Sequence, residues 1–244
     1  MCKKKIIGLF SIMLALVTIS SSNITAIAER DQIMEGMIYI NNYEVTSENA
    51  MLIVNSVPLF SLRAFFEGVG SRVEYKQETG EVLIHHLNDV LSCECISERN
   101  TIIVTRMINP ANLFMNVVTL APMGHGGYYR VVNDRIYLGR EAFEWMLRGL
   151  GYRVNVDLEN RKAYITSVTM QDFKNVTIGL TGTEVTTEWG WALPEELNGD
   201  RHLRLYALSD GSYFALQYAG DSAVNSVERI CFVDPNGRIF ELVQ

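Results

Sequence analysis

Histidines and cysteines are the first residues of this chain to consider for chemistry, because imidazole and thiolate groups are the usual ligands of zinc and copper. His85 and His86 are adjacent, and Cys93 and Cys95 are separated by one residue. Adjacent residues of a strand point to opposite faces of a sheet, so the two histidines are not expected to bind one ion. The remaining histidines show no ligand spacing: they are His125 and His202. The sequence therefore predicts no metal site and no cofactor.

Two further motifs could indicate catalysis or phosphate binding. Glu195 and Glu196 form an acidic pair after Pro194, and paired carboxylates can hydrolyse glycosidic bonds, but adjacent loop residues rarely face each other across a substrate. The glycine-rich segment 124–127 lacks the strand-to-helix setting of a phosphate-binding loop, and no serine occupies a nucleophile elbow. We predict no catalytic residue and interpret the protein as not an enzyme.

Three aromatic residues are the candidates for binding. Trp189 and Trp191 flank Gly190, and Tyr206 follows in the next predicted strand. Exposed aromatic side chains stack on sugars or anchor a protein partner. The alternative is structural: Trp189 would pack a short helix against the core, and Trp191 would cap the sheet.

Two segments of the chain before these aromatic residues are similar to each other. The first covers residues 59–84, LFSLRAFFEGVGSRVEYKQETGEVLI, and the second covers residues 136–165, IYLGREAFEWMLRGLGYRVNVDLENRKAYI. In each, an arginine opens an apolar helix, a glycine ends it, and two strands joined by a polar turn follow. Internal repetition of this kind is typical of a folding unit rather than a reaction centre. We predict β–α–β–β repeats at about residues 36–86 and 102–168.

Four residues of these repeats receive structural roles. Arg63 and Arg140 open the two helices, where a guanidinium fork suits a salt bridge or hydrogen bonds to the carbonyls of a facing strand. A place in a ligand groove is the alternative for both arginines. Gly70 and Gly151 follow the two helices, as expected of residues that end them.

A different pattern begins near residue 171. Thr181 and Glu184 have the spacing of a capping box, which predicts a short helix over Gly182–Trp189 that ends at Gly190. Four β segments follow at residues 203–208, 213–218, 227–233 and 239–243, with glycine-containing turns between them. We therefore predict an α+β fold, in which a small helix-plus-antiparallel-sheet domain at 171–244 follows a stalk-like region at 36–168.

The N-terminus resembles a secretory signal peptide over residues 1–28. Three lysines precede an apolar run, and Ala26-Ile27-Ala28 supplies small residues for cleavage. The apolar run is shorter than the roughly 20 residues of a spanning helix, so we expect contact with the membrane only if this segment is not cleaved. Its removal changes the formal net charge from −7 to −10 because three lysines are lost. That charge disfavours a nucleic-acid partner, and we expect a secreted or cell-surface protein.

Three cysteines remain after the predicted cleavage: Cys93, Cys95 and Cys231. Small domains that depend on disulfides carry more cysteines and an even number of them. The hydrophobic core is therefore expected to hold the fold, and the sequence leaves open whether two of these thiols are joined.

The repeated segments resemble the copper amine oxidase N-terminal-like domain, a stalk module with a run of the type "vPLRalaEalGa-V-WD" after a short "vNG" hairpin. The residues that match this pattern in the first segment are Leu62, Arg63, Ala64, Glu67, Gly70 and Val73. Those of the second segment are Tyr137, Arg140, Leu150, Gly151, Tyr152, Val154 and Asp157. The resemblance implies a structural or interaction role at the surface of a Gram-positive bacterium, and it implies no copper chemistry.

The C-terminal segment resembles the small outer-membrane-assembly lipoprotein fold of the SmpA/OmlA type. The residues that carry this second resemblance are Gly179, Thr181, Glu184, Val185, Gly190, Pro194 and the segment 206–212. It implies binding to another protein.

These observations favour a non-catalytic exported protein of the cell envelope, which acts as a stalk or interaction module and binds a protein or a cell-wall polymer. Two alternatives stay open. One is a cell-wall or polysaccharide hydrolase with its site between the repeat region and the C-terminal domain. The other is an inhibitor or assembly factor that acts through the C-terminal domain.

Overall fold

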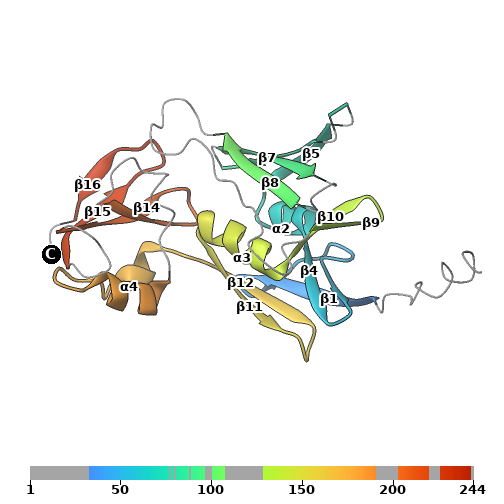
Figure 1. The fold of residues 1–244 in the computed structure, drawn as a ribbon, viewed down its shortest axis with the longest axis horizontal. Helices are drawn as coiled ribbons and strands as arrows, with labels where there is room; N and C mark the ends of the chain where they lie inside the picture. Colours follow the sequence, from blue (N-terminus) through green and yellow to red (C-terminus); the bar gives the residue numbers. More distant parts are fainter. Residues whose placement is uncertain are drawn as a thin grey trace, which may run out of the picture. The chain divides into compact units, whose positions relative to one another are not determined.

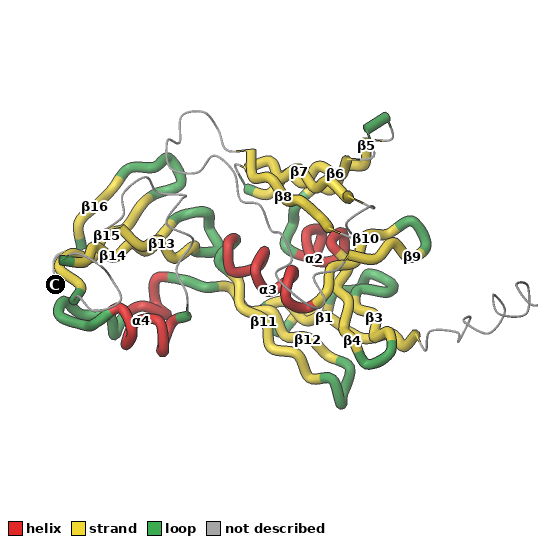
Figure 2. Tube along the Cα trace, viewed as in Figure 1, coloured by secondary structure: helices red, strands yellow, loops and turns green. Residues whose placement is uncertain are grey.

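The computed structural model describes residues 33–76, 78–79, 81–87, 89–96, 101–107, 129–190, 203–219 and 226–242. Several residues discussed above lie outside the described ranges: the predicted signal peptide, the glycine-rich segment 124–127, Trp191, the pair Glu195–Glu196, His125 and His202. The described chain is mixed α and β, and strands predominate, as Figure 2 shows. This composition is compatible with the α+β class predicted from the sequence.

The largest sheet has eight strands in the order β11-β12-β1-β3-β4-β10-β9, with β2 paired to β1 (Figure 1). Its members are β1 (Ile33–Ile40), β2 (Tyr43–Glu44), β3 (Met51–Val54), β4 (Val57–Ser61), β9 (Tyr129–Val132), β10 (Arg135–Gly139), β11 (Tyr152–Asp157) and β12 (Lys162–Ser167).

Both similar segments contribute strands to this sheet. β10 pairs with β4 in antiparallel orientation, and β12 pairs with β1 in parallel orientation. The strands β1, β3 and β4 of the first segment therefore lie between strands of the second segment on both sides. We expected a separate short sheet within each segment. A hairpin alone leaves the N–H and C=O groups of its edge strands without partners, and pairing between strands of the two segments satisfies these groups.

A second sheet follows chain order, with four antiparallel strands: β5 (Arg72–Lys76), β6 (Glu81–His86), β7 (Asp89–Ile96) and β8 (Thr101–Met107). The second repeat predicted from the sequence begins at about residue 102, within the range of β8. This strand, β8, pairs with β7 and so joins the sheet that the first segment begins.

Two amphipathic helices fill the space between these sheets. In α2 (Leu62–Gly68), Ser61 is the N-cap and its Oγ accepts a hydrogen bond from the Ala64 N–H at 3.3 Å, as the sequence predicts. α3 (Arg140–Gly149) is longer by three residues and buries Phe143 and Met146 on one face. One core cluster contains apolar residues of both helices and both sheets, which explains why the helices lie between two layers of strands.

Aromatic rings form the centre of this core. Phe143 of α3 stacks on Phe60 of β4 with ring centroids 4.5 Å apart and nearly parallel planes. Phe65 of α2 meets Phe143 edge-on at 5.6 Å and Tyr152 of β11 edge-on at 5.4 Å. Offset and edge-to-face pairs of this kind add stability beyond the burial of area, so this region joins the two segments tightly.

The C-terminal part follows the predicted order closely. It contains a short 3₁₀ helix η2 (Met170–Phe173), then α4 (Gly182–Trp189), and an antiparallel meander of β13 (Leu203–Ala207), β14 (Tyr213–Tyr218), β15 (Val227–Val233) and β16 (Ile239–Glu241). Phe173 stacks on Phe214 at 4.4 Å, and Val185 of α4 belongs to the same buried cluster. The capping box at Thr181 and the helix end at Gly190 are confirmed.

The capping box allows a test of pH dependence. The Glu184 carboxylate accepts hydrogen bonds from the Thr181 N–H and hydroxyl, each at 2.8 Å, and these bonds hold the pKa of Glu184 below its ordinary value of 4.5. A carboxyl group whose pKa is lowered in the folded state stabilises the protein at pH values above its ordinary pKa. This stabilisation is lost as the pH falls through the lowered pKa. Glu184→Gln is therefore expected to lower the urea midpoint near neutral pH, and the midpoints of variant and wild type should converge in acid.

The matched control lies in the same helix. The Thr187 hydroxyl donates to the Thr183 carbonyl at 2.8 Å and carries no titratable group, so Thr187→Ala should show a difference from wild type that does not change with pH. A Glu184→Gln difference that stayed constant into acid would contradict the prediction.

Among the described residues, no helix is long and apolar enough to cross a membrane.

Candidate functional site

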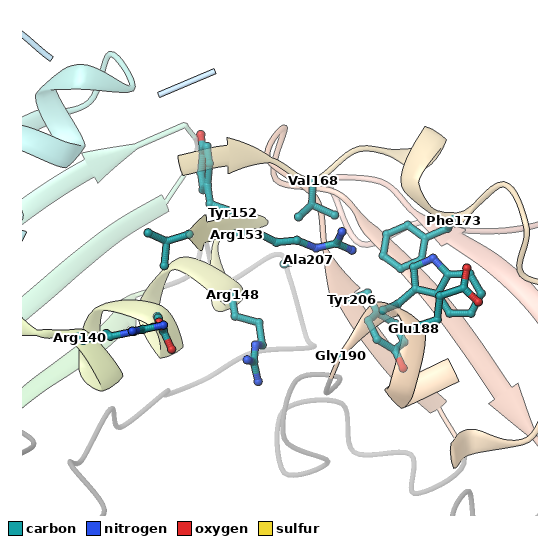
Figure 3. Close-up of a pocket in the computed structure, with 13 residues that line it drawn as sticks. Arg140, Arg148, Tyr152, Arg153, Val168, Phe173, Glu188, Gly190, Tyr206 and Ala207 are labelled. Carbon is teal, nitrogen blue, oxygen red and sulfur yellow. The ribbon is translucent and has the colours of Figure 1, made fainter. Parts of the chain in front are cut away.

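A cleft of about 450 Å³ lies between α3 and β11 on one side and η2, α4 and β13 on the other. Figure 3 shows its walls. The wall formed by α3 and β11 contributes arginines, and the opposite wall contributes aromatic rings. The polar and aromatic residues that line it are Arg140, Glu144, Arg148, Arg153, Glu188, Tyr152, Phe173, Trp189 and Tyr206.

The three arginines of the cleft differ in how firmly they are held. Arg140 Nε lies 2.6 Å from Glu144 Oε1, a close salt bridge within α3. Arg153 Nη1 lies 3.8 Å from Asp172 Oδ1, which leaves most of its five donors for other acceptors. The Arg148 guanidinium lies 5.7 Å from the centre of the Trp145 ring, and within the described residues it forms no salt bridge. Arg148 and Arg153 are therefore the cations most able to bind an anionic group.

Helix spacing explains why two of these arginines reach the same cleft. Arg140, Glu144 and Arg148 are four residues apart in turn, so they lie along one face of α3. In Figure 3 the Arg153 side chain extends from β11 toward Phe173. Sequence reasoning missed Arg148 and Arg153. The four-residue spacing from Arg140 could have identified Arg148, but Arg153 is marked only by its position in the assembled sheet.

The aromatic wall is rigid. Trp189, the last residue of α4, is half-buried, and its Nε1–H donates to the Asp172 carbonyl at 2.7 Å. Gly190 has φ of 85°, a conformation that glycine adopts readily, and it ends the helix directly after the indole. Tyr206 is only 6% exposed and packs against Phe173 at 5.5 Å, and burial raises its pKa, so the phenol stays neutral. Tyr206 forms a fixed floor rather than an exposed platform.

The structure thus brings together two of the three predicted binding residues, Trp189 and Tyr206, while Trp191 lies outside the described ranges. Of the two helix-opening arginines, Arg140 lines the cleft, whereas Arg63 forms a 3.7 Å salt bridge with Glu67 on α2. Both arginines pair with a glutamate four residues later in their own helix, and neither of these two pairs involves a facing strand.

The residues considered for metal binding have separate environments. His86 is buried, with its Nδ1 2.7 Å from the Ser71 hydroxyl, whereas His85 is partly exposed beside Glu74. The two imidazoles therefore lie on opposite faces of β6, as predicted. In the described part of the chain, no group of three His, Cys, Asp or Glu residues could hold a metal ion.

Two of the three cysteines have described side chains, and both are buried. Cys93 lies in β7, in the sheet beside α2, whereas Cys231 lies in β15 of the C-terminal meander. Burial raises the pKa of the Cys231 thiol, so the thiol is protonated at neutral pH.

Comparison of the chain with protein-family models, with curated proteins and with solved structures gives no match.

Proposed function

We propose that this is a non-catalytic exported protein of the bacterial cell envelope, an interaction module that holds a segment of a protein or a cell-wall polymer in the cleft between α3 and α4. The observation that carries this proposal is the pairing of two arginines, Arg148 and Arg153, with a fixed aromatic wall at Trp189. Among the described residues, most of the donors of these two arginines have no partner. Guanidinium groups bind carboxylates and phosphates, and an indole binds apolar or sugar faces.

Rigidity of the walls supports a binding role. The indole is held by its hydrogen bond to Asp172, and Tyr206 and Phe173 belong to a buried cluster. Side chains that are already ordered lose little conformational entropy when a partner binds. The cleft is therefore suited to recognition without rearrangement.

We also infer that the region before residue 168 arose from a duplicated β–α–β–β unit of the stalk type. Corresponding glycines follow the two helices with the same left-handed conformation, φ of 79° at Gly70 and 77° at Gly151. Corresponding turns, Asn55–Ser56 and Asn133–Asp134, have positive φ at both residues, as in two-residue hairpins. Each helix also carries an Arg–Glu pair four residues apart. Duplication of this unit is consistent with a stalk-like region that supports the cleft.

One observation favours hydrolysis as the second candidate function. Glu144 and Glu188 line the cleft from opposite walls, the arrangement in which two carboxylates could flank a glycosidic bond. Release of reducing sugar from peptidoglycan or polysaccharide that disappeared in both Glu144→Gln and Glu188→Gln would favour this function over simple binding.

Arg148→Ala and Arg153→Ala are each expected to weaken binding to the natural partner about tenfold, a loss of about 1.4 kcal/mol from a charge-assisted hydrogen bond. The measurement is the fraction of purified protein retained by isolated Gram-positive cell walls and by envelope-protein extract across a range of concentrations. Arg63→Ala is the control, because Arg63 opens the matching helix α2 but does not line the cleft.

Equal retention of wild type, Arg148→Ala and Arg153→Ala on both materials would contradict the cleft as the binding site. A loss shared by Arg63→Ala would do the same, since it would indicate a diffuse charge effect.

A further inference from the structure

We propose that the partner is a polypeptide: an extended, acidic segment that adds as a strand to the free edge of β11 within the cleft. This inference rests on the proposed binding function and specifies its ligand. It draws on three features of the structure: the direction of the β11 backbone groups, the alternation of its side chains, and the charge of the cleft.

The backbone of β11 has an edge with no partner strand in the described chain, because β11 ends the order of the eight-stranded sheet and pairs only with β12. The Val168 N–H donates to the Gly151 carbonyl at 2.7 Å, which sets the hydrogen-bond phase of this antiparallel pair. Hydrogen-bonded and non-hydrogen-bonded pairs then alternate. It follows that the N–H and C=O groups of Arg153 and Asn155 point toward β12, whereas those of Val154 point away from it, on the side open to another strand.

The side chains of β11 alternate between two chemical characters. Arg153 and Asn155 are exposed on one face, and Val154 and Val156 are partly buried at the margin of the main core on the other. A strand added beside β11 would place its residues next to these by the same alternation. Acidic side chains would therefore lie beside Arg153, and apolar side chains would extend the core beyond Val154.

The cleft is lined by part of this strand and favours the same kind of partner. Tyr152, Arg153 and Val154 line the cleft together with Arg148 and Trp189. Since Arg148 has no salt bridge among the described residues and Arg153 only a distant one, an acidic partner meets two available guanidinium groups. Strand addition supplies affinity through the main chain, and the pockets beside it supply specificity.

Two other occupants fit less well. An anionic cell-wall polymer would use the arginines but not the peptide groups of Val154. In one antiparallel register, a second copy pairing β11 with β11 would set Arg153 opposite Asp157. That carboxylate already accepts from the Asn160 N–H at 3.0 Å and from the Asn160 side chain at 2.7 Å.

The test uses the synthetic peptide acetyl-Thr-Val-Glu-Val-Glu-Val-Thr-amide and three comparison probes. The first is the same peptide with alternate backbone amides N-methylated, so that it cannot complete a ladder. The second has lysine in place of both glutamates. The third is poly(glycerol phosphate). Affinity is measured by isothermal titration calorimetry, and hydrogen exchange is followed at the Val154 and Val156 amides.

The expected result is that the acidic peptide binds, that N-methylation and the lysine replacement each weaken binding at least tenfold, and that the bound peptide slows exchange at Val154. Arg153→Ala should weaken binding about tenfold, and Arg63→Ala should leave it unchanged. Equal binding of the N-methylated peptide would overturn strand addition even if the arginines were needed.

Other outcomes separate this inference from the function on which it rests. Binding of poly(glycerol phosphate) that depends on Arg148 and Arg153, with no binding of the peptide, would overturn the inference and leave the proposed function standing. A dimer in light scattering that Arg153→Asp dissociates would show that a second copy occupies the edge. If neither the peptide nor the polymer binds, and cell walls and envelope-protein extract retain the arginine variants as they retain wild type, both proposals fail.

Discussion

Gly151→Ala is expected to destabilise the protein by roughly 3 kcal/mol, through backbone strain together with a steric conflict. Gly151 has φ of 77°, where a residue with a Cβ is strained. An added Cβ would also lie 2.6 Å from the Leu208 carbonyl oxygen, and closer still to the Leu208 carbonyl carbon and the Ser209 nitrogen. Because these are backbone atoms, they cannot move aside as a flexible side chain would.

Gly70→Ala is a matched control for this prediction. Gly70 follows the other helix with φ of 79°, but a Cβ there meets nothing within 4 Å. Gly70→Ala should therefore lower the free energy of unfolding only by the strain of a left-handed backbone, about 1 kcal/mol. Urea unfolding followed by far-ultraviolet circular dichroism measures both free energies. Equal losses in the two variants would contradict the close approach of Gly151 to the β13–β14 turn.

The same contact connects β11 to the C-terminal sheet. The Val168 N–H donates to the Gly151 carbonyl at 2.7 Å, and the Ser209 N–H donates to the Val168 carbonyl at 3.0 Å. These bonds lie beside the cleft, since Val168 is one of its lining residues. Gly151→Ala should therefore weaken binding as well as stability, whereas Gly70→Ala should leave binding unchanged.

Phe143→Ala is expected to cost about 4 kcal/mol of unfolding free energy, within the range for removal of a fully buried aromatic ring. Phe143 is completely buried, stacks on Phe60 at 4.5 Å and meets Phe65 edge-on at 5.6 Å. It lies where a helix of the second segment contacts a strand and a helix of the first. Its removal leaves a cavity at the point where the two segments share their core.

Trp145→Ala provides the comparison within the same helix. Trp145 is 51% exposed, and its ring contacts the Arg148 guanidinium, so its loss should cost only about 0.5 kcal/mol. Denaturant midpoints by circular dichroism compare the two variants without relying on tryptophan fluorescence. Similar losses for both variants would be inconsistent with a core centred on Phe143.

The elements that could be predicted from the sequence are those that depend on residues close together in the chain. The Ser61 N-cap, the Thr181–Glu184 capping box and the C-terminal strands all appear where expected, because each depends on hydrogen bonds or apolar alternation between near neighbours in the chain. The same local reasoning placed Trp189 at the end of a helix. It also indicated that Gly70 and Gly151 follow helices.

Only the tertiary structure decided how these elements pair and which side chains meet. Met37 pairs with Lys162, and Tyr137 pairs with Ser61, because burial and edge pairing are satisfied between segments far apart in the chain. The cleft arises in the same way, since Arg153 and Trp189 come from elements with no local relation. A residue's own type determines which groups it could bind, but the pairing of distant strands determines which groups it meets.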